Sequence, residues 1–158
     1  MRRRITVAFL VASLSVVLVA TLAQAAPRLE VHIEVLTTLP PGPGVFDPFI
    51  ASGPAVDAGL FCATGTVSTS PVVWSPPLGG GTFAILTMVK YFVCGDSSGT
   101  FDVELWVICD LQTGNTSGHW RVVAGTGSCA NLKGNGKLLG FYDASTNTVL
   151  DIYAGRVK

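Results

Sequence analysis

The stretch "VVAGTGSCANLKGNG", Val122 to Gly136, separates two strand-like segments and contains Gly125, Gly127, Gly134 and Gly136. Glycine adopts positive φ without steric cost and allows close backbone approach, so it is favoured where a strand bends or bulges. A phosphate-binding loop is the alternative, because glycine-rich turns expose backbone N–H groups. That alternative needs a following helix and a Gly-Lys-Ser/Thr motif, and the sequence has neither. We therefore interpret the stretch as a strand corner in a small, strongly curved β-barrel.

The segments around this corner have the pattern of β-strands. In "LEVHIEVL", residues 29–36, apolar and polar residues alternate without a break, as in a half-buried antiparallel strand. Further strands are expected at residues 56–67, 71–74, 82–94, 100–109, 119–124, 137–142 and 148–157. No segment after the first 25 residues has sustained helical spacing of apolar residues. These eight segments predict an all-β fold, a single antiparallel eight-stranded β-barrel, with a β-sandwich as the alternative.

A proline-rich segment, "TLPPGPGVFDPFIASGP", follows the first expected strand. Proline has no backbone N–H and is excluded from regular helices and central strands. We therefore expect residues 38–54 to form a long connection that packs Phe46 and Phe49 onto the barrel.

The N-terminus has the features of a secretory signal. Arg2, Arg3 and Arg4 precede a long apolar run, and small residues stand at Ala23 and Ala25. This pattern predicts cleavage after residue 25, which leaves residues 26–158 as one secreted domain, extracellular or periplasmic. The apolar run is also long enough to span a bilayer, so a membrane anchor is the alternative. Cleavage would leave no stable membrane anchor.

The charge of the expected mature domain gives no support to nucleic-acid binding. Seven Lys and Arg against ten Asp and Glu leave a net charge of −3. The basic residues are scattered and do not alternate with aromatic residues, as a nucleic-acid surface requires.

All four cysteines, Cys62, Cys94, Cys109 and Cys129, lie in the expected secreted domain. An even number in an oxidising compartment predicts two disulfides, with three pairings open. A metal site is not expected, because the sequence has no Cys-x-x-Cys pair and its two histidines stand alone. No cofactor is predicted either.

The segment "GHWRVVAGTGSCANLKGNGKL" resembles the Gly-Thr-Gly signature of the allene oxide cyclase and dirigent barrel superfamily. The pieces "CATGTV" and "VCGDSSGTF" look like those of uncharacterised secreted bacterial proteins with a similar pattern. The resemblance implies an eight-stranded antiparallel barrel and permits a cyclase or isomerase activity. Its motif positions are Gly125, Thr126, Gly127, Leu132, Gly134 and Gly136. The catalytic residues of the superfamily cannot be placed on this sequence.

One position departs from that signature. Cys129 stands where the superfamily usually has an aromatic residue, and a disulfide there would replace the lost packing. The resemblance thus suggests that Cys129 pairs with Cys109 in the preceding strand, which leaves Cys62 with Cys94.

No catalytic motif is present, whether Gly-x-Ser-x-Gly or His-Glu-x-x-His. His119 is expected to face solvent, and an acid–base role would need a carboxylate such as Asp102 or Glu104. Glu104 shares strand parity with Trp106 and Ile108 and is a candidate for the interior, but a surface carboxylate is the favoured interpretation. Aromatic residues are the better indication of a pocket, although core packing is the alternative role for them. Candidate ligand-binding residues are Trp106, Trp120, Phe92 and Tyr142.

Three functions follow from these observations. The first is a disulfide-stabilised barrel that binds a small apolar or aromatic molecule. The second is a cyclase or isomerase that acts by confining its substrate. The third is a structural or interaction protein whose interior is filled by its own side chains. The lack of an acid–base pair favours binding, and the sequence does not predict the oligomeric state.

Overall fold

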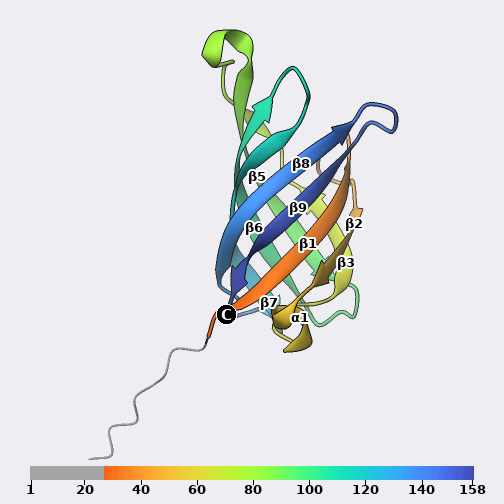
Figure 1. Cartoon of the computed structure of the whole chain (residues 1–158). Helices are drawn as coiled ribbons and strands as arrows, with labels where there is room; N and C mark the ends of the chain where they lie inside the picture. Colours follow the sequence, from red (N-terminus) through yellow and green to blue (C-terminus); the bar gives the residue numbers. More distant parts are fainter. Residues whose placement is uncertain (1–26) are drawn as a thin grey trace, which may run out of the picture.

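The computed structural model describes residues 27–158, which form a closed antiparallel barrel of eight strands with one additional strand outside it (Figure 1). The predicted signal peptide and its cleavage site at residue 25 lie outside the described residues. The strands are β1 Leu29–Thr38, β2 Asp47–Ser52, β3 Thr64–Thr69, β4 Val73–Trp74, β5 Phe83–Cys94, β6 Gly99–Asp110, β7 Thr116–Gly127, β8 Gly134–Asp143 and β9 Thr148–Val157. The barrel closes where β3 pairs with β5, which confirms the predicted fold class.

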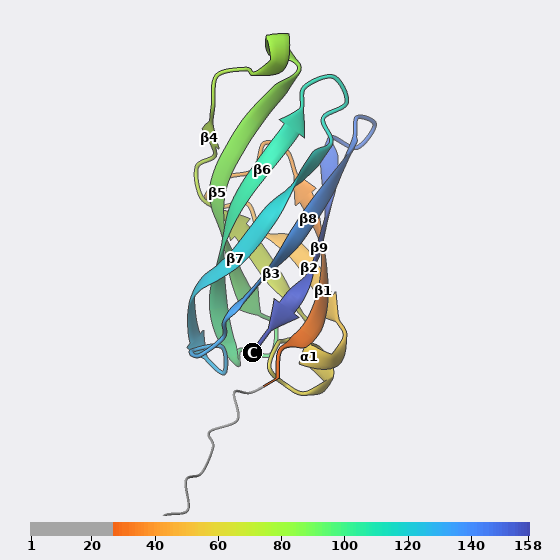
Figure 2. The same cartoon turned by 60° about the vertical axis from the view of Figure 1, so that its left-hand side comes forward.

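The two ends of the barrel differ. One end, called here the closed end, carries the short helix α1 (Pro54–Asp57), the C-terminus and the β5–β6 and β7–β8 connections (Figures 1 and 2). The other end, called here the cavity end, carries the β1–β2, β6–β7 and β8–β9 connections. Within residues 27–158, no helix is long and apolar enough to cross a membrane.

The strand assignment from sequence was wrong in one region. Residues 47–52 form the barrel strand β2, where a proline-rich connection was expected. Pro48 is tolerated because β2 pairs with β1 only from Phe49 onward, so the missing N–H of Pro48 interrupts no pairing on that side. Phe49 is buried in the core as expected, but Phe46 is 65% exposed.

Two neighbouring predictions also need correction. Residues 56–63 are not part of a strand: they include the end of α1 and a turn, and β3 begins only at Thr64. The segment at 71–74 contributes a two-residue strand, β4, which pairs with β5 beyond β3 and is not one of the eight barrel strands.

The closed half of the barrel interior is filled by aromatic side chains. Phe92 and Phe101 stack with ring centroids 4.6 Å apart, and Phe49 and Phe61 pack against this pair. Tyr153 packs edge-on against Phe92, at 6.1 Å between centroids. These contacts leave the closed half of the barrel as a solid core.

The glycine-rich stretch comprises a bulged end of β7, the connection to β8 and the start of β8. Val123 has no partner on β6, because Ala124 pairs with Asp102 and Val122 with Val103, so β7 carries a bulge. Gly127 then has φ of +56°, and a Cβ there would overlap the carbonyl oxygen of Ser98. The remaining motif glycines have ordinary φ and permit close approach: Gly125 to the Cys129 carbonyl, and Gly134 and Gly136 to the backbone of β9. The bend therefore has a mechanical basis in the backbone.

One of the two predicted disulfides is present. Cys62 and Cys94 are joined at the closed end, whereas Cys109 and Cys129 are buried free thiols. The predicted pairing of Cys109 with Cys129 is wrong because these residues lie at opposite ends of β6. Cys129 lies beside Gly99, and Cys109 is ten residues further along that strand, about 33 Å away at ~3.3 Å per residue. A disulfide needs Cα atoms within about 7 Å.

Candidate functional site

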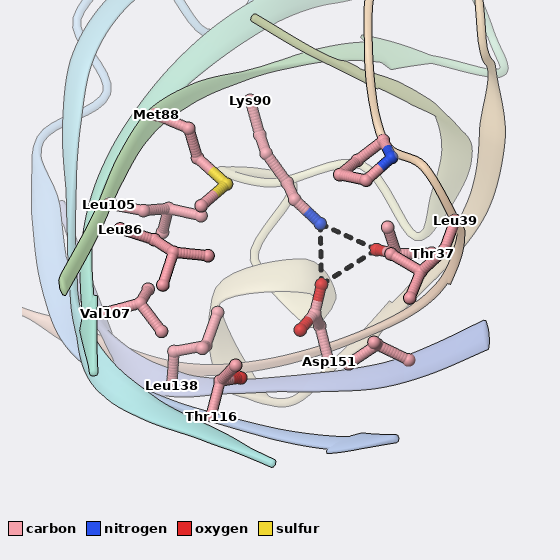
Figure 3. Close-up of a pocket in the computed structure, with 12 residues that line it drawn as sticks. Thr37, Leu39, Leu86, Met88, Lys90, Leu105, Val107, Thr116, Leu138 and Asp151 are labelled. Atoms are coloured by element: carbon pink, nitrogen blue, oxygen red, sulfur yellow. Dashed lines mark hydrogen bonds and ion pairs between the residues drawn. The ribbon is translucent and has the colours of Figure 1, made fainter. Parts of the chain in front are cut away.

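The barrel contains a cavity of about 70 Å³ between the aromatic core and the cavity end (Figure 3). Its walls are mainly aliphatic, and the β1–β2 connection contributes to them at the mouth. The lining residues are Thr37, Leu39, Pro41, Leu86, Met88, Lys90, Leu105, Val107, Thr116, Leu138, Val149 and Asp151. Leu39, Pro41, Met88 and Thr116 are partly exposed, so the cavity reaches the surface at this end.

A buried ion pair crosses this cavity. The Lys90 Nζ atom lies 2.6 Å from Asp151 Oδ2 and donates a second hydrogen bond to Thr37 Oγ1 at 2.7 Å. The Thr37 hydroxyl donates to the same Asp151 oxygen at 2.8 Å, which closes a three-membered network (Figure 3). All three residues are buried, at no more than 7% exposure. Buried charges of this kind are stable only when they are paired and hydrogen-bonded, and both conditions are met here.

The strand alternation explains how these charges come to be inside. In β5, inward-facing positions are Ala84, Leu86, Met88, Lys90, Phe92 and Cys94. In β9, the inward positions include Val149, Asp151 and Tyr153. Lys90 and Asp151 thus occupy core positions in otherwise apolar rows. Neither residue was among the candidates predicted from the sequence, although a single charge in an otherwise apolar alternating row was a signal that could have found them.

The four predicted ligand-binding residues are not brought together. Trp120 and Phe92 are buried in the barrel interior, but in or beside the aromatic core and not on the cavity wall. Trp106 faces outward, is 42% exposed and stacks under the Arg121 guanidinium at 5.3 Å. Tyr142 lies beyond the cavity at the rim, against Gly114. Ligand contact at these four residues stays a prediction.

The predicted acid–base candidates lie outside the barrel. His119 is exposed on β7, opposite Trp106, as expected. Glu104 also faces outward, where its carboxylate accepts a hydrogen bond from Arg121 at 2.7 Å, so it has the surface position that the sequence favoured over the interior. Burial raises the pKa of Asp102. Among the described residues, no cluster of His, Cys, Asp or Glu could hold a metal ion.

A second hollow of about 820 Å³ lies on the outer surface, over β5 to β9. Ile85, Trp106, Ile108 and Leu139 surround it, and Gly118 at its floor carries no side chain. This outer hollow is broad and apolar but lacks the enclosed charged groups of the internal cavity.

Comparisons of the chain with known protein families, curated proteins and solved structures found no match. The geometry of the cavity is therefore the basis for assigning a function.

Proposed function

We propose that this protein is an exported binding barrel that takes a small, mainly apolar molecule, or the end of a longer one, into the cavity at its cavity end. The observation that carries the proposal is the combination of aliphatic walls with the Lys90–Asp151 pair in a barrel whose other half is solid. Binding pockets typically combine apolar walls with a few placed polar groups. The Cys62–Cys94 disulfide is compatible with an oxidising extracellular or periplasmic location.

The size of the cavity limits what enters it. About 70 Å³ is roughly half of the ~150 Å³ cavity that accepts benzene in an engineered protein. A whole drug-sized ligand does not fit, since such pockets usually have about 300–1,000 Å³. The chain of a longer ligand would leave at the mouth of the cavity, beside the β1–β2 connection that contributes Leu39 and Pro41 to the wall. Met88, a flexible side chain at the wall, gives the cavity some freedom to adapt.

Binding is supported better than catalysis by the same geometry. Lys90 and Asp151 could in principle transfer protons, but each is hydrogen-bonded to the other. The described residues that line the cavity also include no histidine or cysteine, the side chains that most often act as general base or nucleophile.

A cavity-filling substitution tests the proposal. The wild-type protein and Val107→Phe are compared for thermal unfolding with a panel of C4–C8 alcohols, ketones and hydrocarbons. Ligands that bind the native state raise the melting temperature. At a ligand concentration of a hundred times Kd, the free energy of unfolding rises by about 2.7 kcal/mol. We expect stabilisation of the wild type that is lost in Val107→Phe and retained in Val123→Phe, whose ring would be added on the outer face.

A second cavity-filling variant, Leu86→Phe, provides the same test if Val107→Phe does not fold, because Leu86 lines the same cavity from another strand. Native mass spectrometry of the exported protein provides an independent test by looking for a co-purified small molecule. The proposal is contradicted if no compound stabilises the wild type, or if the filled variants respond as the wild type does.

A further inference from the structure

We infer that the molecule held in the cavity has an uncharged polar end that both donates and accepts a hydrogen bond, as an alcohol does. This inference rests on the proposed function and specifies the chemistry of its ligand. It follows from the charge balance of the cavity and from the hydrogen-bonding groups that the protein leaves unused.

The charge balance excludes an ionised ligand. Lys90 and Asp151 are the charged residues on the cavity wall among the described residues, and their charges cancel. A carboxylate or an ammonium entering the cavity would bring a third charge without a counter-ion. Burying such a charge costs far more than burying a hydrogen-bonded neutral group.

Unused acceptor capacity lies on one side of the ion pair. Asp151 Oδ2 accepts from both Lys90 and Thr37, whereas Asp151 Oδ1 accepts no hydrogen bond within residues 27–158. No hydrogen bond of the Thr116 hydroxyl is found in that part of the chain either, although Thr116 lines the cavity. Both oxygens lie against the position that a Cβ on Gly140 would occupy. The absence of a side chain at Gly140 therefore gives these two atoms their space.

Unused donor capacity lies on the Lys90 side. An ammonium group has three N–H donors, and Lys90 uses two of them in its hydrogen bonds to Thr37 and Asp151. No third acceptor is found for Nζ within the described residues, and Nζ lies over the Tyr153 ring, 5.9 Å from the ring centroid. A hydroxyl oxygen of a ligand can accept from Nζ and from the Thr116 hydroxyl, while its proton is donated to Asp151 Oδ1. A ketone could make only the first of these bonds and a hydrocarbon neither.

The experiment compares three probes that share one chain and differ in the end group: hexan-1-ol, hexanoate and hexylammonium at pH 7.5. Affinities are measured by calorimetry on the wild type. We expect hexan-1-ol to bind more tightly than either ion by about tenfold or more. Val107→Phe should abolish binding of the alcohol, which locates it in the cavity.

Changing the charge balance should change the preference. Asp151→Asn leaves the Lys90 charge without a counter-ion, so hexanoate should become the preferred probe. Lys90→Met leaves the Asp151 charge alone, so hexylammonium should be preferred. Thr116→Val keeps the ion pair and is the variant expected to disturb the structure least. It should lower the affinity for hexan-1-ol several-fold and leave the low affinities for hexanoate and hexylammonium unchanged.

The outcomes separate the two proposals. If none of the three probes binds the wild type but ketones or hydrocarbons of the panel do, this inference fails and the proposed function stands. If no compound of either set binds, both fail. If hexanoate or hexylammonium binds the wild type as tightly as the alcohol, the cavity still binds ligands but the inference on the polar end is wrong. If the two charge variants do not fold, the inference is tested by the order of the three affinities on the wild type and on Thr116→Val. It is wrong if hexan-1-ol is not the tightest probe of the wild type or if Thr116→Val leaves its affinity unchanged.

Discussion

Lys90 and Asp151 stand on strands four places apart in a ring of eight, so their 2.6 Å contact joins diametrically opposite walls of the barrel. The contact lies where the aromatic core gives way to the cavity. It thus connects the stability of the barrel to the chemistry of its proposed binding site.

This cross-barrel contact makes a prediction on stability. Lys90→Met or Asp151→Leu should each lower the free energy of unfolding by about 3–5 kcal/mol, because the remaining charge is buried without its partner. The double variant should be markedly more stable than the less stable single variant, since no charge is left unpaired. Urea denaturation of the wild type, the two single variants and the double variant gives the coupling free energy between the two residues. Additive losses in the double variant would show that the two residues do not form the buried pair.

The Tyr153 hydroxyl is buried without a hydrogen-bond partner in the described part of the chain, and burial raises the pKa of this phenol well above its usual value. An unsatisfied buried polar group costs about 1–3 kcal/mol. Tyr153→Phe should therefore leave the barrel equally stable or more stable. As a control, Trp120→Phe should destabilise it, because the Trp120 Nε1–H donates to the Lys137 carbonyl at 3.1 Å. A loss of more than 1 kcal/mol in Tyr153→Phe would reveal a partner for the hydroxyl.

The four cysteines should react as one disulfide and two protected thiols. Burial raises the pKa of the Cys109 and Cys129 thiols, so both should react slowly with iodoacetamide in the folded protein. Intact mass should show two alkylated cysteines after denaturation without reductant, and four with reductant. Loss of the Cys62–Cys94 bridge, in Cys94→Ser, should cost about 3–4 kcal/mol for a separation of 32 residues. No alkylation in denaturant would mean a second disulfide.

The bend after β7 should depend on Gly127. Gly127→Val should destabilise the barrel by more than ~1 kcal/mol, because its φ is positive and the added carbon would overlap the Ser98 carbonyl. Gly42→Ala is the matched control, since a Cβ at Gly42 meets no atom within 4 Å and its φ is ordinary. Equal melting temperatures for both variants would remove the mechanical explanation of the bend.

Alternation and turn residues were sufficient to predict most of the fold. The strand at 148–157 was predicted with its observed bounds, and those at 82–94 and 100–109 to within one residue at each end. Pro48 concealed β2, because the rule against proline in a central strand assumes that both neighbours pair along its whole length.

The candidate site was much less predictable. The prediction relied on aromatic residues, but those in the barrel interior fill its closed half, and Trp106 faces outward. Strand alternation shows which residues share a face, and it does not show which face is inside. Lys90 and Asp151 are 61 residues apart in sequence, and only the closure of the barrel places them in contact. The pairing of Cys109 with Cys129 failed for a different reason, because the two cysteines lie at opposite ends of β6.

The central claim is that ligands enter the barrel interior, and methyl NMR during a titration with hexan-1-ol tests it most directly. We predict saturable shift changes at the methyl groups of Leu86, Leu105 and Val149, which line the internal cavity and not the outer hollow. The methyl groups of Ile85, Ile108 and Leu139, on the outer hollow, should remain unchanged. Changes confined to the outer group, with the internal methyl groups unaffected at saturation, would contradict the claim and locate binding on the outer surface of the barrel.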